Sequence, residues 1–418
     1  MTEWQTKAVG EIADTQLGKM LNKGKQSGKY SKPYLRTDNV HWGRFDLSEI
    51  KEMDILPDEQ DKYLATRGDL LMCEGGASGR TAIWNEDYDI SFQNHVHRIR
   101  PKNPQEISPK YLLYYFEWFI KNGYASDLIK GVTISSLSQS GLRSIEVAYP
   151  PIDEQLKIVE ILEDHLSRLD AALADIKQGK LKAAQFRRSL LQAAFTGNLG
   201  SGGTSFKTEL PSDWSLVSLN EAMAECKNGL TYRNNPELAG FPVSRIETIS
   251  KGEIDFEKVG YGGVSLDGNQ KHLLNPGDIL FSHINSMLHV GKVAIYKSGM
   301  PALLHGMNLL RITPNDGFVP EFLFYLFQSS DVRKQIWSKA KHAVNQASIN
   351  IGELKTVVIP KPPFEEQHKI VELLEDHLSR LDVSVSLADE MEKQSNGLRR
   401  SLLQAAFTGQ LTNEVIIV

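Results

Sequence analysis

Several short stretches carry residue types that occur in enzyme active sites, and each departs from the motif that it resembles. Lys361-Pro362-Pro363-Phe364 is similar to the Asn/Asp-Pro-Pro-Phe/Tyr loop of amino-methyltransferases, but lysine replaces the hydrogen-bonding Asn/Asp. Residues 24–29 (GKQSGK) resemble a phosphate-binding loop that is one residue short and continues with Tyr30 where Ser or Thr is required. Residues 74–79 (EGGASG) have no dinucleotide-binding fingerprint around them. These departures predict a chain without a catalytic site.

Residues that bind metals or form disulfides are few and scattered. Cys73 and Cys226 do not occupy equivalent positions and form no metal-binding spacing. His165 and His377 recur at the same position of a repeated segment, and their spacing gives no metal cluster. We therefore expect no bound metal, and reduced thiols in a cytoplasmic protein.

The overall composition is that of a globular protein. The chain has 418 residues, of which 41% are hydrophobic and 24% charged, enough for two or three ordinary cores. The net charge of −5 gives no support to nucleic-acid binding, so any basic surface must be local. No apolar run is long enough to span a membrane, and the sequence MTEWQTKAVG lacks the features of a signal segment.

The segment that organises the chain occurs twice. Residues 154–199 match residues 366–411 at a constant offset of 212 without a gap. Two prolines precede each copy, acidic residues fill its first turn, and Gly197 or Gly409 closes its end. We expect two long helices, each roughly 60–65 Å in length at about 1.5 Å per residue.

An apolar stripe with heptad spacing runs along each predicted helix. In the first copy the stripe resumes one residue late past Gly179, as an inserted residue would cause, and comprises Leu162, Leu166, Leu169, Leu173, Ile176, then Leu181, Ala184, Leu191 and Phe195. In the second copy it comprises Leu374, Leu378, Leu381, Val385, Ala388, Met391, Leu398 and Leu402. Matching stripes predict that the two helices pair with each other; the alternative is two separate core helices.

Similarity between the copies is uneven. They agree at 15 of 17 positions over 154–170 and at all 11 over 187–197, but at none of 16 over 171–186. Packing needs only apolar residues, so identical polar residues indicate a second constraint, such as two copies of one partner protein. Recent duplication is the alternative, and the diverged middle argues against it. The candidate partner-binding residues are Glu160, Asp164, Arg168, Arg187, Arg188, Glu372, Asp376, Arg380, Arg399 and Arg400.

The segments that precede the helices are also distant copies of each other. Residues 36–40 correspond to 245–249, 68–71 to 277–280, and 79–83 to 291–295. Short alternating runs with Gly and Asp indicate strands and turns, and one helix is expected in each segment, at 109–121 and 320–328. The predicted fold is mixed α/β with an internal pseudo-two-fold repeat. Its parts are domain 1 (1–150), helix (151–199), Gly/Ser linker (200–206), domain 2 (207–361), helix (362–411) and tail (412–418).

Over nearly its whole length the chain resembles the specificity subunits of type I restriction–modification systems. The repeated helix start PP-x-x-EQ-x-x-IV and the helix end LLQAAFTG carry the resemblance most strongly, each beside a domain that ends in an Ile/Val-rich strand. Weaker marks are PYLR with its following Gly and Asp, and the GD-[LI]-L turn. The terminal TNEVIIV has no role that we can assign.

The resemblance implies an architecture and a set of partners. The globular domains would be target-recognition domains for double-stranded DNA, held a fixed distance apart by paired antiparallel helices that also dock two methyltransferase subunits. The chain would be a non-catalytic subunit of a complex that methylates adenine and, with restriction subunits, cleaves DNA. S-adenosylmethionine, and ATP with Mg for restriction, would bind to the partner subunits and not to this chain.

Candidate base and phosphate contacts lie in loops where the two domains differ between matching framework segments. In domain 1 they are Lys29, Tyr30, Lys32, Arg36, Ser78, Arg80, Ser135, Ser136 and Ser138. In domain 2 they are Tyr232, Arg233, Arg245, His283, Asn285, Lys292, Asn345 and Gln346. For each candidate the equal alternative is a solvated loop residue, and for Arg36 and Arg245, which occupy matched positions, a further alternative is a framework ion pair. The alternative function for the whole chain is a coiled-coil scaffold with two protein-binding domains.

Overall fold

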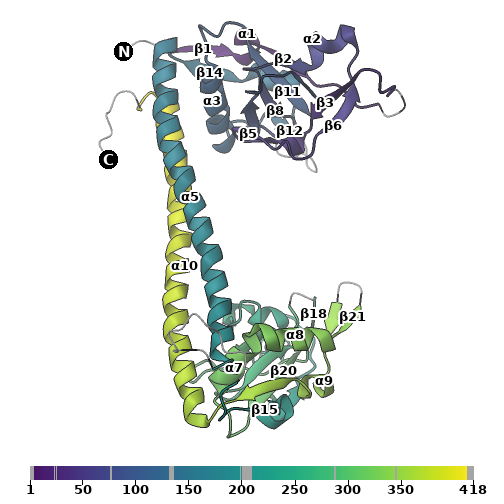
Figure 1. Ribbon diagram of the computed structural model, residues 1–418, viewed down its shortest axis with the longest axis vertical. Helices are drawn as coiled ribbons and strands as arrows, with labels where there is room; N and C mark the ends of the chain where they lie inside the picture. The colour runs from purple at the N-terminus through teal and green to yellow at the C-terminus, as the bar shows by residue number, and fades with distance from the viewer. Residues whose placement is uncertain are drawn as a thin grey trace. The chain divides into compact units, whose positions relative to one another are not determined.

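The chain forms two compact units, each built from one globular domain and parts of both long helices (Figure 1). The computed structural model describes residues 4–411, with the exception of 23, 25, 76–77, 131–135, 198, 200–209, 287–288 and 344–345. The first unit comprises Met1–Ile176 and Glu390–Val418, and the second comprises Lys177–Asp389. The predicted linker and tail lie outside the described residues.

The first globular domain contains two four-stranded sheets, with strand orders β6-β3-β10-β7 and β2-β11-β8-β9, and the pairs β1–β14, β12–β13 and β4–β5. Its strands are β1 (Gln5–Ala8), β2 (Ala13–Leu17), β3 (Ser31–Leu35), β4 (Val40–His41), β5 (Arg44–Phe45), β6 (Lys51–Asp54), β7 (Leu64–Ala65), β8 (Leu70–Cys73), β9 (Thr81–Ile83), β10 (Ile90–Phe92), β11 (Val96–Pro101), β12 (Ile129–Lys130), β13 (Ser136–Leu137) and β14 (Glu146–Tyr149). Its helices are α1 (Val9–Ile12), η2 (Thr37–Asn39), η3 (Pro57–Glu59), α2 (Gln60–Tyr63), α3 (Pro109–Lys121) and α4 (Gln139–Ser144).

The second globular domain repeats this plan with fewer strands: a four-stranded sheet β16-β20-β17-β19, a three-stranded sheet β18-β22-β21 and the pair β15–β23. Its strands are β15 (Ser215–Ser218), β16 (Met223–Asn228), β17 (Ile279–Ser282), β18 (Ile284–Asn285), β19 (Val293–Ile295), β20 (Leu309–Pro314), β21 (Lys341–Ala343), β22 (Gln346–Ser348) and β23 (Val358–Lys361). Its helices are α6 (Leu219–Ala222), η4 (Ile246–Ile249), η5 (Phe256–Lys258), η6 (Gln270–His272), α7 (Pro320–Gln328), α8 (Ser330–Lys339) and α9 (Ile351–Lys355).

The predicted helices at 109–121 and 320–328 are confirmed as α3 and α7 with the same bounds. Both begin with proline, which is suited to a first helical position because its missing N–H would have no partner there. The expectation of one helix per domain is wrong, because α8 directly follows α7 in the second domain. Only Val332 and Ile336 are buried along α8, so its apolar pattern is too sparse to indicate a helix.

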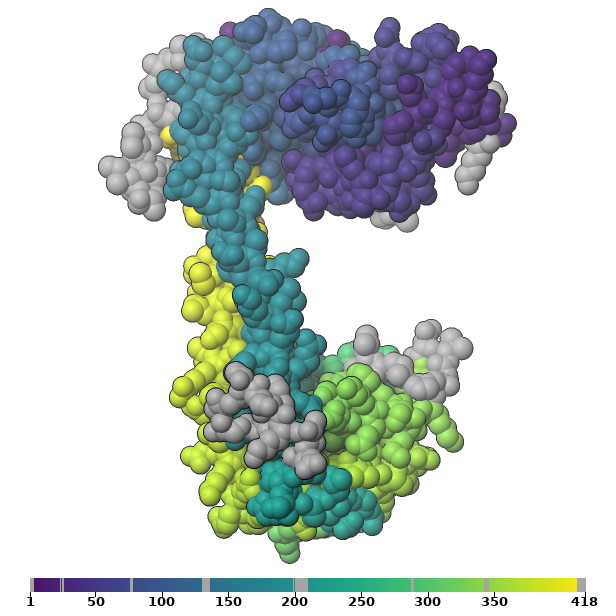
Figure 2. Space-filling view, viewed as in Figure 1, coloured from purple at the N-terminus to yellow at the C-terminus, as the bar shows by residue number. Residues whose placement is uncertain are grey.

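The two long helices are α5 (Ile152–Ala194) and α10 (Phe364–Phe407). In the second unit Lys180 pairs with Asp389 at 2.5 Å, and Arg187 pairs with Asp382 at 2.8 Å. A move of seven residues forward on α5 thus matches seven residues backward on α10, so the helices are antiparallel in this unit. Figure 2 shows the two segments side by side on its surface.

The first unit contains the symmetry-related ion pair. Arg399 pairs with Asp170 at 2.8 Å. The offset of the repeat relates Arg399 to Arg187 and Asp382 to Asp170, so the two units use the same interhelical contact. These contacts confirm the pseudo-two-fold repeat, and with the sheets and helices above they confirm the mixed α/β fold class.

The predicted phase shift in the apolar stripe past Gly179 is wrong. Leu181 is 54% exposed and Leu398 52%, and Ala184 and Met391 are also exposed, whereas Leu191 and Phe195 of the predicted stripe are buried in the core of the second unit. The buried or half-buried face of α5 continues in unbroken heptads through Lys180, Ala183, Arg187, Leu190 and Ala194. Polar side chains fill inward positions in the middle because Asp389 and Asp382 pair with them. A prediction that follows only the apolar residues therefore selects neighbouring residues on the outer face of the helix.

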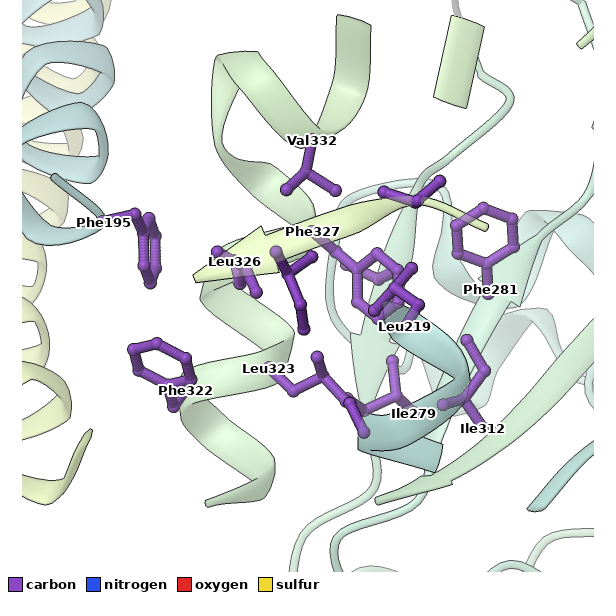
Figure 3. Close-up of a cluster of buried hydrophobic side chains, with 14 of the residues drawn as sticks. Phe195, Leu219, Ile279, Phe281, Ile312, Phe322, Leu323, Leu326, Phe327 and Val332 are labelled. Atoms are coloured by element: carbon purple, nitrogen blue, oxygen red, sulfur yellow. The ribbon is translucent and has the colours of Figure 1, made fainter. Parts of the chain in front are cut away.

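Each domain core receives the end of one long helix and the beginning of the other. In the second unit Phe195, the residue after the end of α5, faces Phe322 of α7 with ring centroids 5.3 Å apart (Figure 3), and Leu374 of α10 is buried in the same cluster. In the first unit Phe407 of α10 packs against Tyr111, Tyr115 and Trp118 of α3, at 5.3 to 5.5 Å. The identical helix ends are thus core-forming segments.

Within the described ranges, no helix has the length and apolar character needed to cross a membrane. Cys73 and Cys226 are free thiols, and burial raises the pKa of each to about 11.

Candidate nucleic-acid interface

Matched hydrogen bonds give the two domains the same frame around their candidate loops. The amide of Leu137 donates to the carbonyl of Glu74 at 2.8 Å. In the second domain the amide of Ile349 donates to the carbonyl of His283 at 2.9 Å. The hydroxyl of Ser138 and the side-chain carbonyl of Asn350 then cap the short helices α4 and α9. Loops after β8 and β17 are therefore held in equivalent positions.

Two buried glutamines attach each frame to its long helix. Gln155 accepts a hydrogen bond from the amide of Ser108 at 3.0 Å, and Gln367 accepts one from Val319 at 2.9 Å. Each glutamine also donates to two main-chain carbonyls. Gln155 donates to those of Glu106 and Pro150, and Gln367 to those of Gly317 and Pro362. Both side chains are fully buried, which explains why glutamine is present at this position in both repeats.

Arg80 and Lys292, at matched positions, both bond to the main chain. Nη2 of Arg80 donates to the carbonyl of Thr37 at 3.0 Å, and Nζ of Lys292 donates to the carbonyl of Ser250 at 2.7 Å. Thr37 begins the short helix η2 and Ser250 follows its equivalent η4. Each cation therefore fixes a turn while remaining partly exposed.

Asp54 organises the loop that carries Lys29 and Tyr30. Its carboxylate accepts hydrogen bonds from the Ser27 amide, the Ser27 hydroxyl at 2.7 Å, the Gly28 amide at 3.0 Å and the Tyr30 amide at 3.3 Å. These bonds, the Ser27 hydroxyl foremost, hold the pKa of Asp54 below its usual value. Lys29 is exposed, with Nζ 5.4 Å from the centroid of the Tyr30 ring. Lys32 is exposed on β3 beside this loop.

The matched arginines are engaged within their own domains. Arg36 lies 3.5 Å from Asp38 and 3.5 Å from Glu49, and its side chain is 19% exposed. Arg245 lies 3.2 Å from Glu247. These contacts fit the framework alternative that the sequence leaves open for both residues.

The serine candidates of the first domain surround the end of β8. The hydroxyl of Ser78 donates to the carbonyl of Glu74 at 2.9 Å, and Ser136 bridges to Gly75 as part of β13. Ser138 is occupied as the cap of α4, where it accepts from Gly141 at 3.1 Å. Ser135 lies outside the described residues.

In the second domain, Tyr232 and Arg233 lie against a glycine-rich turn. A Cβ atom on Gly260 would come within 1.9 Å of the Tyr232 hydroxyl and 2.7 Å of Cδ of Arg245, so only glycine fits there. Burial raises the pKa of Tyr232. Arg233 is exposed, and the turn presents a second aromatic side chain, Tyr261, at 37% exposure.

Strand pairing brings three other candidates of the second domain together. Asn285 on β18 lies opposite Ala347 of β22, next to the exposed Gln346. His283 immediately precedes β18 and is buried, which lowers its pKa and keeps the ring neutral near pH 7. Asn345 lies outside the described residues.

The candidate partner-binding residues divide into two groups. Arg187 and Arg399 are half-buried in interhelical ion pairs, and Arg399 also contacts Glu117 of α3 at 3.1 Å. The exposed residues on the outer faces of the helices are Glu160, Asp164, Arg168, Arg188, Glu372, Asp376, Arg380 and Arg400. Two matched ion pairs join members of this second group, Arg168 with Asp164 at 3.0 Å and Arg380 with Asp376 at 2.9 Å.

Sequence reasoning missed Asp54, Gln155, Gln367 and Arg333, which position loops or lie beside them. The identity of the two glutamines across the repeat was a usable signal. Asp54 and Arg333 have no such signal, because their roles depend on contacts between distant segments.

Comparison with known proteins gives consistent results. The family model described as the type I restriction modification DNA specificity domain matches twice, at residues 1–182 and 211–392. A putative type I restriction enzyme specificity subunit, MjaX of Methanocaldococcus jannaschii, is 42% identical over 199 residues, which is 46% of each chain. The EcoKI specificity subunit of Escherichia coli K12 is 25% identical over 91% of this chain and 82% of that protein. The chain thus spans about half the length of the first relative and most of the second.

Solved structures share the fold. One, from work on complex assembly and conformational transition of the type I R-M system, has a TM-score of 0.70 at 18% identity and covers 98% of both chains. The HsdS subunit from Thermoanaerobacter tengcongensis has a TM-score of 0.53 at 18% identity, over 98% of this chain and 97% of that one.

Proposed function

Because this chain belongs to the type I restriction–modification DNA specificity family, we propose that it is the subunit through which a restriction–modification complex recognises its DNA sequence. The observation that carries the proposal is the double match of the specificity domain, once in each half of the chain. Two domains with one frame and different loops can read two different half-sites. The DNA target would therefore be bipartite and need not be palindromic.

Recognition would combine phosphate contacts that orient the duplex with base contacts that select the sequence. The exposed Lys29, Lys32 and Arg233 form no ion pair with any described residue and are therefore available for phosphate contacts, while Asn285 and Gln346 offer amide groups suited to base edges. A protein-binding scaffold, the alternative function, would give no reason for the double specificity domain.

The chemistry would belong to partner subunits. We propose that the chain itself transfers no methyl group and cleaves no DNA, and that S-adenosylmethionine and ATP with Mg bind to the methyltransferase and restriction subunits. Two methyltransferase subunits would dock on the two repeats.

The function is tested by exchanging one domain. Replacing residues 1–149 by the corresponding domain of a relative, with Glu117 and Trp118 retained to contact α10, should change one half of the methylated motif and leave the other. Sequencing of methylated positions gives the motif. A change in both halves, or an assembled complex that binds duplex DNA without salt dependence, would contradict the proposal.

Partner docking is tested with the exposed arginines. Charge reversal at Arg188 should remove one methyltransferase copy, and reversal at Arg400 should remove the other, because both residues are exposed at equivalent helix positions. Sedimentation of the complex measures the stoichiometry. Reversal at Lys182, also exposed on α5, is the control. Two copies per chain in both arginine variants would show that docking uses other residues.

A further inference from the structure

Helix α8 places one arginine on the face that packs against the turn before β19. Ile336 lies against Gly291, where an added Cβ atom would be 3.5 Å from its side chain, and Nε1 of Trp337 donates to the carbonyl of Val290 at 3.3 Å. Arg333 lies on the same face, three and four residues before them. Its guanidinium carbon is 5.2 Å from the centroid of the Trp337 ring. Stacking therefore holds Arg333 beside the turn that carries Lys292.

The Arg333 side chain is half-buried without a counter-charge. Its Nε atom is buried and has no hydrogen-bond partner, and no ion pair joins Arg333 to any carboxylate in the part of the chain that the structure describes. Burial lowers the pKa of Arg333. A guanidinium group that is buried without a carboxylate partner loses hydration free energy, and this lowers the stability of the folded chain when nothing else is bound.

Lys292 adds a second positive charge at the same place. One of its three N–H donors is used on the Ser250 carbonyl at 2.7 Å, which leaves two donors for another group. Burial lowers the pKa of Lys292, and the neighbouring charge of Arg333 lowers it further. Among the described residues Lys292 likewise forms no ion pair, so two cations lie together without an acid.

Among the described residues, Nε of Arg98 and of Arg311 is also buried without a partner, but the terminal guanidinium nitrogens of these arginines and of Arg100 bond within the chain, and no such bond is found for Arg333. Arg311 is paired with Glu225, Arg100 with Asp69 at 2.6 Å, and Arg98 donates to two main-chain carbonyls. The Lys292 and Arg333 pair is the arrangement expected where an external anion supplies the missing charge.

We propose that Lys292 and Arg333 together bind one phosphate of the DNA backbone when the second domain engages its half-site. This inference rests on the proposed function. A guanidinium fork and an ammonium group suit a phosphate oxygen pair, and such a contact carries no base information. Arg333 would therefore strengthen binding equally for all sequences and fix the register of the domain on the duplex.

The test measures binding of the assembled complex to a duplex with its methylated motif and to a scrambled duplex, across a range of KCl concentrations. R333Q should weaken both affinities by the same factor, roughly tenfold. The double variant K292Q/R333Q leaves that phosphate without a cation and should reduce the log–log salt slope by about 0.9, the value for one lost phosphate contact. R333K retains the charge and should keep the native slope. K334Q is the matched control, because Lys334 is 75% exposed on the same helix.

A native salt slope in K292Q/R333Q, or a loss of affinity in K334Q equal to that in R333Q, would overturn the phosphate contact while leaving the proposed function intact. So would loss of sequence selectivity in R333Q, which would indicate a base contact. Binding of inorganic phosphate that R333Q abolishes, with a native DNA salt slope, would make this a site for free phosphate and not for DNA. Failure of the native complex to bind either duplex would overturn the proposed function as well.

Discussion

Individual charged residues of this chain either hold loops in place or are presented to solvent. Arg36 and Arg80 contact carboxylates or main-chain carbonyls of their own domain, whereas Lys29 and Arg233 are exposed. A residue of the first kind affects recognition through the loop that it supports. A residue of the second kind can contact DNA directly.

Asp54 is the clearest loop-positioning residue, and D54N should release residues 26–30. The single carbonyl oxygen of an amide cannot accept all four hydrogen bonds that the two carboxylate oxygens accept, so the amides of Ser27, Gly28 and Tyr30 cannot all keep their partner. Hydrogen exchange at these amides should become faster, and the half-site read by the first domain should be methylated less selectively. E52Q, an exposed neighbour on β6, is the control. Unchanged exchange in D54N would show that the loop is held by other contacts.

The sign of the pH dependence follows from the lowered pKa of Asp54. A carboxylate whose pKa is depressed in the folded state stabilises that state fully above its unfolded value, about 3.9, and the contribution is lost as the pH falls through the folded value. Exchange at Ser27 and Gly28 should therefore stay slow from pH 8 down to about 5. If exchange at these two amides became faster as the pH falls from 8 to about 5, another titrating group would control the loop.

Residue types alone could not separate these two classes. The sequence correctly suggested that Arg80 and Lys292 correspond, because both follow glycine in matched segments. That each reaches back to a carbonyl many residues away depends on packing between distant segments. Which candidates contact DNA stays a prediction.

At the scale of elements, the identical helix ends are explained by packing inside the chain. Leu403, Ala406 and Phe407 are buried in the first unit, as Leu191, Ala194 and Phe195 are in the second. The first domain thus depends on the end of α10, which lies far away in the sequence. The second depends on the end of the first repeat, at Leu191, Ala194 and Phe195. The same sequence is required at both ends because both domains offer an aromatic helix, α3 or α7, at the contact.

Truncation of these phenylalanines should act on one unit each. F407A should destabilise the first unit by about 3–5 kcal/mol and F195A the second by a similar amount, since each ring is nearly fully buried. Chemical denaturation followed by hydrogen exchange in each domain measures the two effects. F186A removes an exposed ring from α5 and should change stability by less than about 0.5 kcal/mol. A loss of methyltransferase binding without loss of stability would assign the helix ends to partner docking.

Strong local signals made some elements predictable and not others. Proline at the first position and a continuous apolar face located α3 and α7 correctly. The phase of the helix pairing was misjudged because Lys180 and Arg187 occupy inward positions while Leu181 and Phe186 lie outside. Interhelical ion pairs decide that arrangement, and the sequence does not indicate which charges are inward.

At the scale of the whole molecule, the chain repeats one framework and varies its loops. The matched ion pairs Arg187–Asp382 and Arg399–Asp170 lie at equivalent positions, so the duplication extends to the contacts between the helices. The middle of each helix differs in sequence but remains helical. Under the proposed function, we therefore expect the length of this middle part, and not its sequence, to set the spacing of the DNA half-sites.

Insertion of one heptad into both helices tests that role. Because the inward positions of both helices recur with heptad spacing, seven residues added after Ile176 in α5 and before Lys393 in α10 keep these positions in phase. The helices lengthen by about 10 Å, which corresponds to about three base pairs at ~3.4 Å each. The added base pairs also rotate one half-site by roughly 100° about the DNA axis, so affinity should fall.

Methylome sequencing should show unchanged half-sites with a longer gap, or no methylation. A two-residue insertion, which turns the inward face by about 200°, should abolish activity. Full activity at the native spacing in the heptad variant would show that another feature of the complex sets the distance.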